Sequence, residues 1–464
     1  MELDHPKRYP LGSLLANELG LFSLLLLGMV MAPSLWAQEV SYDRYGSVSS
    51  KDSLSEESAE SSGSLQSFGK HFLVYPFELI RRPVDRTLIF LEDYHVYDKA
   101  NWVYEQLKNR GLEPKVLSFA LSGEDRLGGG IDLDFTRLTH LKEHSPNTTL
   151  KASGFLSIDH LSDYQVTLNQ ERIGGTGLFA GSRFQYENRG EEHFYGIGPN
   201  TSLGDETSYR MERTTLVLPV GYEFSNSWKA KAQFAYQNVN ITNGKDGRLG
   251  IIDDIFVATG RRQIPGLGGD ELLSWGLDLE HDNRDDKELP SQGGYERLHF
   301  SYHKGLESNS GFFRYRAEGA HFFKLLSDRR ILAFRGLMEH NNETSNREVP
   351  FFDMARLGGY GVYPWYGDTH RGFRRDRFYD DSLLLFNLEY RWTVWEHREW
   401  RMDTAFFWDE GQVFGDWSDF QFKGLRASYG IGLRLCVEGQ VLITLDLARS
   451  REGTQIYVET KTPF

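Results

Sequence analysis

The chain has 464 residues, of which 39% are hydrophobic and 25% charged, with a formal net charge of -14. The acidic excess offers no basic surface, so we expect no nucleic-acid partner. Its single cysteine, Cys436, excludes an internal disulfide and a cysteine-based metal site. Mean hydropathy is -0.49, and no apolar run after residue 37 is long enough for a membrane-spanning helix.

Residues 1–37 have the layout of a secretory signal peptide. Lys7 and Arg8 precede an apolar stretch at 21–31, and a short segment ending at Ala37 follows it. This order of charged start, short apolar core and small residue is typical of exported proteins. We predict export with cleavage after Ala37. The alternative, an uncleaved membrane anchor, usually has a longer apolar core.

Two short segments follow the predicted signal peptide. Residues 38–68 are rich in Ser and Glu and too polar to bury a core, so we predict a disordered linker. Residues 69–114 include an amphipathic stretch at 91–110 that ends before Gly111, which predicts one short helix. We interpret 69–114 as a plug or a periplasmic lead-in segment.

From residue 115 to residue 464 the sequence alternates with a period of two. In four stretches apolar residues occupy every second position: 131–135, 384–392, 425–435 and 441–447. Charged residues such as Glu389, Arg391, Arg434 and Asp446 occupy the opposite positions in mid-strand. A membrane barrel has this pattern, because its outer face meets lipid and its inner face meets water.

The spacing predicts about sixteen strands, which is an even number. Their expected bounds are 115–122, 128–138, 149–159, 162–170, 177–187, 208–221, 227–240, 270–282, 293–305, 311–324, 329–341, 383–393, 400–409, 425–437, 440–450 and 454–464. The long connections, at 188–207, 241–269, 342–382 and 410–424, all follow odd-numbered strands. Long loops on one side only are typical of outer-membrane barrels. We predict an all-β, transmembrane antiparallel β-barrel with both ends on the periplasmic side.

The end of the sequence supports the same compartment. Ile456, Val458 and Phe464 share one parity, so a terminal aromatic residue closes an alternating strand. This resembles the C-terminal signal of bacterial outer-membrane barrels. It implies a Gram-negative outer membrane, contact with outer-membrane lipid, and insertion by the barrel assembly machinery. Thr462 and Pro463 depart from the usual pattern, and Pro463 cannot donate a ladder hydrogen bond.

Four motifs, in order, resemble one family of barrels. They are Phe194–Gly198, Asp282–Asp286 with Gly293–Gly294, Val349–Phe373 with its Leu-Gly-Gly and Arg-Gly-Phe segments, and Phe406–Gly411 before Ser428–Arg434. Together they are similar to the BamA/TamA-type surface-antigen barrels of the outer-membrane assembly and translocation superfamily. The resemblance covers Phe194–Phe464.

The resemblance implies a long loop that folds back into the lumen. Arg371, Gly372 and Phe373 would form its tip, and Arg371 would meet an acidic residue on the inner wall. Asp409 has the parity of the lumenal set and is our candidate. A guanidinium fork suits a carboxylate, and Gly372 permits a tight turn. The alternative is that Arg371 is one of several exposed basic residues. His370 stands where the family usually has an aliphatic residue.

Motifs for catalysis and for ligand binding are missing from the sequence. We find no HExxH spacing among the histidines, no Gly-x-Ser-x-Gly elbow and no phosphate-binding loop. The Asp282–Asp286 cluster is interpreted as a solvated turn rather than a cation site. We therefore expect no enzyme activity, no cofactor, no metal and no catalytic residue. A Ser/His pair on a barrel wall would leave no local motif, so an enzyme stays open as a third hypothesis.

Two functions compete for such a barrel. The resemblance implies insertion or transport of protein, or of lipid, at the outer membrane, through a weak seam between the first and last strands. We expect no POTRA array in 69–114, so a periplasmic partner or client would be needed, contacted through the acidic linker at 51–60. The alternative is a plugged structural or surface-antigen barrel without a client.

Overall fold

A computed structural model describes residues 113–122, 126–134, 147–157, 161–244, 249–252, 264–306, 308–344, 347–361, 369–398, 400–437, 439–459 and 462–464. The predicted signal peptide, linker and helix at 91–110 lie outside these residues. No helix within the described ranges is long and apolar enough to cross a membrane.

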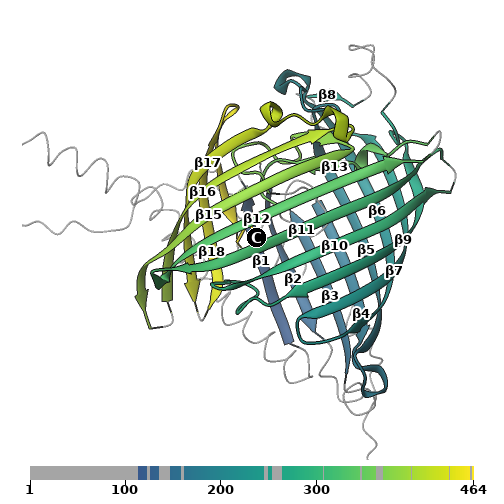
Figure 1. Ribbon diagram of the computed structural model, residues 1–464. Coiled ribbons are helices and arrows are strands. Elements are labelled where there is room, and N and C mark those ends of the chain that lie inside the picture. Colours follow the sequence, from purple (N-terminus) through teal and green to yellow (C-terminus); the bar gives the residue numbers. More distant parts are fainter. Residues whose placement is uncertain are drawn as a thin grey trace, which may run out of the picture. The chain divides into compact units, whose positions relative to one another are not determined.

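One sheet of 17 strands contains nearly all the regular structure of the described chain (Figure 1). Its strands are β1 (Glu113–Ser122), β2 (Arg126–Asp134), β3 (Thr148–Ser157), β4 (Leu161–Gln170), β5 (Leu178–Phe194), β6 (Thr207–Glu223), β7 (Trp228–Asn243), β8 (Gly250–Ile251), β9 (Gly269–Asp282), β10 (Gly293–Gly305), β11 (Gly311–Leu325), β12 (Ser327–Glu343), β15 (Ser382–His397), β16 (Trp400–Phe414), β17 (Arg426–Val437), β18 (Gln440–Ser450) and β19 (Gly453–Glu459). All but the short β8, which runs parallel to β6, pair antiparallel with the next long strand along the chain. The sixteen predicted strands are confirmed.

The strands differ from their predicted bounds mainly at the end that carries the long connections, here called the loop end. β5 and β16 extend to Phe194 and Phe414, five or more residues beyond the alternating pattern. Phe194 and Val413 of these extensions pack against loop residues in apolar clusters, and a register shift between Arg189 and Glu192 interrupts the in–out alternation of β5. The last strand, predicted to reach Phe464, ends at Glu459.

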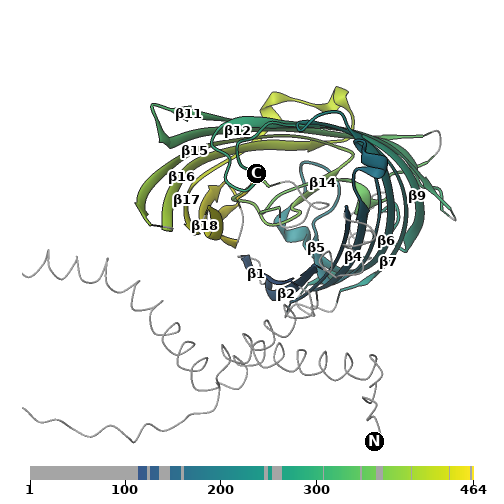
Figure 2. The same ribbon diagram turned by 90° about the horizontal axis from the view of Figure 1, so that it is seen from below.

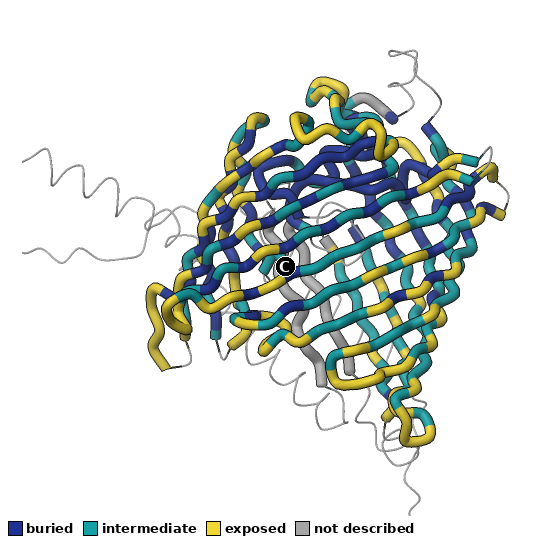
Figure 3. The backbone as a smooth tube through the Cα atoms, viewed as in Figure 1, coloured by how far each residue is buried: buried dark blue, intermediate teal, exposed yellow. Residues whose placement is uncertain are grey.

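Alternation across the wall is confirmed where side chains are described (Figure 3). On β17, Tyr429 and Ile431 point outward and are exposed, whereas Ser428 and Arg434 point inward and are buried. β16 shows the same arrangement, with Trp408 outward and Asp409 inward. The outer surface is therefore an apolar band, and the lumen is lined by charged and polar groups.

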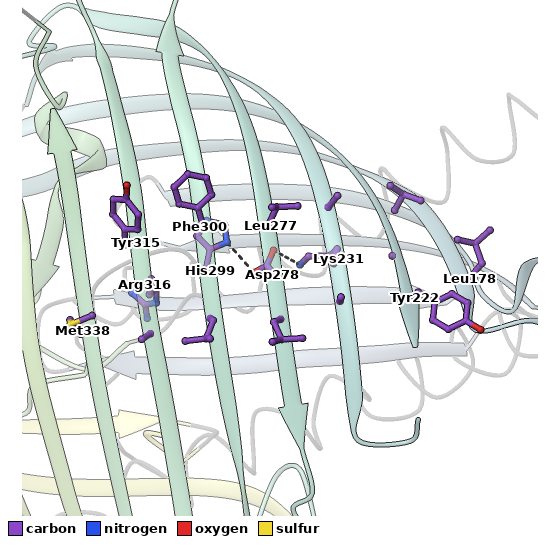
Figure 4. A pocket seen from close by; sticks show the side chains of 17 residues that line it. Leu178, Tyr222, Lys231, Leu277, Asp278, His299, Phe300, Tyr315, Arg316 and Met338 are labelled. Atoms are coloured by element: carbon purple, nitrogen blue, oxygen red, sulfur yellow. Dashed lines mark hydrogen bonds and ion pairs between the residues drawn. The ribbon is translucent and has the colours of Figure 1, made fainter. Parts of the chain in front are cut away.

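A shallow apolar groove crosses the outer wall over β6, β7, β9, β10 and β11 (Figure 4). It has a volume of about 820 Å³, and the small residues Ala230, Ala232 and Ala317 line it beside larger exposed side chains such as Leu277. On the inner face of the same wall Asp278 pairs with Lys231 at 3.3 Å. The wall thus separates an apolar surface from a charged lumen across a single layer of backbone.

The long connection between β12 and β15 folds into the lumen. It contains a 3-10 turn at Phe351–Asp353 and the two-stranded ribbon β13 (Ala355–Leu357) and β14 (Phe378–Asp380). Figure 2 shows β14 inside the ring of strands. Buried side chains of this loop pack on the wall in two apolar clusters, which include Phe351, Tyr379, Leu357 and Phe373. The loop is thus part of the core of the barrel.

Candidate functional site in the lumen

The ribbon β13–β14 positions the loop tip. An isolated bridge between Gly359 and His370 continues the ribbon past Leu357, so Arg371 enters the lumen at a fixed place. Gly358 and Gly359 have φ of 131° and 76°, a region that L residues with a Cβ rarely adopt. Asn387 of β15 donates to the Thr369 carbonyl oxygen at 2.9 Å. The tip is therefore tied to the wall before its charged residue is reached.

Arg371 makes the central contact of the lumen. Its side chain is fully buried, and Nε and Nη2 donate to the two carboxylate oxygens of Asp409, both at 2.8 Å. The backbone N–H of Arg371 donates to the same carboxylate at 3.1 Å. The guanidinium carbon also lies 3.5 Å from the ring centroid of Phe407. The structure thus brings together Arg371 and Asp409 in a bidentate pair.

Two further carboxylates complete the surroundings of Arg371. Nη1 donates to Glu389 at 2.9 Å and to Asp446 at 3.1 Å, and both residues are fully buried. Glu389 also pairs with Arg434 at 3.0 Å and with Arg391 at 2.6 Å. Three carboxylates thus face three guanidinium groups. Such a buried network is costly to form, but once formed it is costly to break.

Gly372 brings the loop backbone against the wall. The hydroxyl of Tyr457 accepts from the Gly372 N–H at 3.0 Å and donates to the Phe373 carbonyl oxygen at 2.7 Å. Ser450 donates to the Gly372 carbonyl oxygen at 2.5 Å. The tip is therefore held by β18 and β19, the strands next to the seam, as well as by β15 and β16.

Gly372→Ala is expected to destabilise the docked loop by on the order of 2–4 kcal/mol. Gly372 has φ +85°, and an added Cβ would lie 2.9 Å from the Ser428 Cβ. Gly439→Ala is a matched control, because Gly439 has φ +81° with nothing within 4 Å of an added Cβ. Urea unfolding of both variants separates the steric clash from backbone strain. Equal losses in the two variants would contradict close packing at Gly372.

Phe373 and His370 complete the tip. Phe373 is fully buried against Phe378, with ring centroids 5.5 Å apart. His370 is also buried, with its ring 4.6 Å from that of Phe373. Burial lowers the pKa of His370 to about 4, although Asp409 favours the protonated ring. His370 is therefore neutral at pH 7, and it behaves there as a ring-shaped packing residue.

The three residues of the predicted C-terminal signal separate in the structure. Ile456 faces outward on β19 and is exposed, and Val458 has the same parity and is half-buried. Phe464 instead lies in the lumen, where its ring is 6.3 Å from that of Phe322 on β11. The expectation that Phe464 extends the last strand with Ile456 and Val458 is therefore wrong. β19 ends at Glu459, five residues before it.

The Asp282–Asp286 segment is a turn stabilised by its own carboxylates. Asp285 accepts from the backbone N–H groups of Ser291 and Gln292, and Asp286 accepts from those of Glu288 and Leu289. These bonds use the oxygens that a cation would need. In the part of the chain that the structure describes, no group of three His, Cys, Asp or Glu side chains could hold a metal ion.

The lumen keeps an open polar space beside the loop. A cavity of about 460 Å³ lies against the inner faces of β4–β10 and is lined by charged residues that include Arg183, Lys229, Glu280 and Arg297. Cys436 also faces inward and is buried. The loop packs on β15–β19 through Arg371 and Gly372 and on β5–β11 through the cluster around Phe351, whereas this cavity is lined by residues of the wall and its turns.

Sequence reasoning placed Arg371 next to Asp409 but missed three other contacts. Glu389 and Asp446 were recognised as lumenal by parity, yet nothing in the sequence selected them as partners of Arg371. Tyr457 lies between Ile456 and Val458, so its inward parity was readable from the pattern. Its bonds to Gly372 and Phe373 depend on how far the loop reaches, which periodicity does not encode.

Sixteen antiparallel strands with an apolar outer face, a charged lumen and an infolded loop define a transmembrane β-barrel of the outer membrane. A model of the Omp85 superfamily domain matches residues 146–455, well over half of the chain. The chain therefore belongs to the Omp85 superfamily.

Two solved structures show the same fold. BamA from Haemophilus ducreyi lacking POTRA domains 1–3 is 13% identical, with a TM-score of 0.53 and coverage of 78% of each chain. CdiB from Escherichia coli is 11% identical, with a TM-score of 0.50, and the match covers 75% of this chain and 62% of that one. No curated protein matches the chain. At these identities the likeness concerns the fold alone.

Proposed function

We propose that this barrel inserts or transports polypeptide, or lipid, at the outer membrane by opening sideways at the seam between β1 and β19. The observation that carries the proposal is the shortness of this seam. Within the described residues, β1 and β19 pair at Leu121 with Val458 and at Ser122 with Tyr457 and nowhere else. By contrast, β18 pairs with β19 from Thr444–Glu459 to Ser450–Gly453, and the other neighbouring strands pair at seven or more positions.

An incomplete seam has a physical consequence in lipid. On its seam side, β1 has no described strand partner between Glu113 and Ala120. Unpaired backbone groups in hydrocarbon cost several kcal/mol each, so such an edge favours pairing with an incoming strand. The edge is near the turn end of the barrel, which we assign to the periplasm from the one-sided loop lengths. A client arriving from the periplasm would meet this edge first.

A plugged surface barrel without a client is the second candidate. It is favoured by the buried Arg371 network and by the apolar loop cluster around Phe351 and Tyr379, which close much of the lumen. Transport through the lumen would require that packing to break. Lateral opening would not, because β1 can move away from the seam while Tyr457 of β19 keeps its bonds to the loop tip. The two candidate functions therefore differ in one result. Cross-linking β1 to β19 should abolish the function of a barrel that opens at the seam and leave a plugged barrel unaffected.

A deletion strain tests the proposal. We expect it to lose a selective set of outer-membrane proteins or lipids, measured by quantitative proteomics and lipid analysis. Wild-type protein should restore them. A protein with Leu121→Cys and Val458→Cys in a Cys436→Ser background should restore them only when reductant opens the disulfide. An unchanged membrane in the deletion strain would favour the plugged barrel, and full rescue by the locked protein would exclude opening at the seam.

The proposed function implies partners for the outer surface of the barrel, for its insertion and for its periplasmic end. The apolar groove and outer band would contact outer-membrane lipid, and the barrel assembly machinery would insert the protein itself. A periplasmic partner or client protein would bind at the turn end. Cleavage of the signal peptide after Ala37 can be checked by N-terminal sequencing of the mature protein.

A further inference from the structure

The last described residues, Thr462–Phe464, contact β11, β15 and the turn between β9 and β10, none of which pairs with the strand that precedes them. β19 ends at Glu459, which pairs with Thr444 of β18, so the first four residues of β18 have no partner on β19. The Thr462 hydroxyl instead donates to the Glu288 carbonyl oxygen at 3.4 Å. Glu288 belongs to the turn between β9 and β10, half a ring of strands away from β19.

Phe464 is held between an aromatic ring and a cation. Its ring centroid lies 6.3 Å from that of Phe322, and the Arg391 guanidinium lies 5.6 Å from the Phe464 ring and 5.4 Å from the Phe322 ring. Arg391 also donates to the Phe464 carbonyl oxygen at 3.3 Å. Glu389 fixes Arg391 by an ion pair of 2.6 Å. An arginine placed over an aromatic face is attracted to it, most strongly where water is excluded.

The wall around Phe464 differs from the rest of the lumen. Ala320, Phe322, Ile331 and Ala333 form a buried apolar cluster on β11 and β12, and Tyr295 and Phe464 pack against it. The other inward positions of these strands include the charged residues Glu318, Arg335 and Glu339. An apolar recess in a charged lumen is unfavourable unless something apolar covers it. The two alanines leave the space, and the aromatic side chain fills it.

We propose that this recess, with Phe322 and Arg391, is a binding site for an aromatic side chain and that Phe464 is its occupant. While the site is occupied, Thr462–Phe464 stay on the β9–β15 wall and cannot pair along Gln440–Ile443 of β18. The bound phenylalanine thus keeps the last strand short. That this controls client access rests on the function proposed for the seam. Glu389 contacts both Arg391 and Arg371, so the site for the aromatic side chain adjoins the ion-pair network that holds the loop tip.

A cysteine switch in purified protein tests the site without any client. Glu288→Cys with Thr462→Cys, in a Cys436→Ser background, should form a disulfide that reports the docked tail. Adding Phe464→Ala should reduce this disulfide about tenfold or more, because the apolar contact of the half-buried Phe464 ring with the recess is lost. Phe323→Ala is the matched control, since Phe323 is adjacent to Phe322 but points outward. Equal disulfide formation in the two variants would overturn the site.

The same cysteine reports where the released tail goes. Extending the β18–β19 register from Thr444–Glu459 would place Thr462 opposite Val441. A Val441→Cys, Thr462→Cys pair should therefore cross-link weakly with Phe464 present and strongly with Phe464→Ala. If Phe464→Ala lowers cross-linking of position 462 to position 288 but does not raise cross-linking to position 441, Phe464 does not control the length of the last strand. Neither result depends on the deletion phenotype, so failure here and failure of the insertion function are distinguishable.

Discussion

Arg371→Ala is expected to undock the lumenal loop and to lower the free energy of unfolding by about 3–5 kcal/mol. Asp409, Glu389 and Asp446 all direct carboxylate oxygens at Arg371, and all three are buried. Removing the guanidinium leaves this negative charge with fewer partners, since Asp409 makes its bidentate pair with Arg371 alone. The loss is therefore larger than that of an exposed ion pair, for which values near 0–1 kcal/mol are usual.

Arg371→Lys separates charge from geometry. A lysine keeps the positive charge but has no fork to bind both oxygens of Asp409, so we expect part of the loss to remain. Arg449→Ala is a matched control, because Arg449 points outward on β18 and is exposed. The measurement is urea unfolding with protease cleavage of the loop as second readout. If Arg371→Ala has the same unfolding free energy as Arg449→Ala and its loop still resists the protease, the ion-pair network does not hold the loop.

His370→Leu is expected to flatten the dependence of stability on pH between about pH 6.5 and pH 4. Burial lowers the pKa of His370 to about 4 from its ordinary value of 6.5. Between these values the unfolded chain binds a proton that the folded protein does not. Stability from the neutral ring is therefore complete above pH 6.5 and is lost as pH falls toward 4. The full loss is on the order of 3 kcal/mol for this group.

Removing the histidine should also help the protein at neutral pH. Among the described residues, the ring nitrogens of His370 find no hydrogen bond of ordinary geometry, although the Asp409 backbone lies close enough to favour the proton. A leucine fills similar space without a buried polar group, so we expect His370→Leu to be at least as stable at pH 7.5. His397→Leu, at an exposed position on β15, is the control. Unfolding free energies at pH 7.5 and 4.5 give the comparison, and an unchanged slope in His370→Leu would contradict the assignment.

The alternation of side chains along each strand explains how much of the fold the sequence could predict. Alternation on β15–β18 placed Asp409, Glu389, Arg434 and Asp446 inside and Trp408 outside, because strand geometry sends successive side chains to opposite faces. Turn residues between these runs marked the strands. One-sided loop lengths then predicted the orientation. These features are local, so periodicity carries them.

Contacts across the lumen were decided by the tertiary structure. Parity shows that a carboxylate points inward, but only the ring of strands brings Asp409, Glu389 and Asp446 around one guanidinium. The position of Phe464 shows the same limit. Its parity with Ile456 and Val458 predicted an outward residue on an extended last strand. In the structure its ring packs instead against the apolar recess on β11 and β12, on the lumenal side of the wall. A recess built from residues more than 120 positions away has no local signature, so the sequence alone determined the wall of this protein and the tertiary structure determined what fills it.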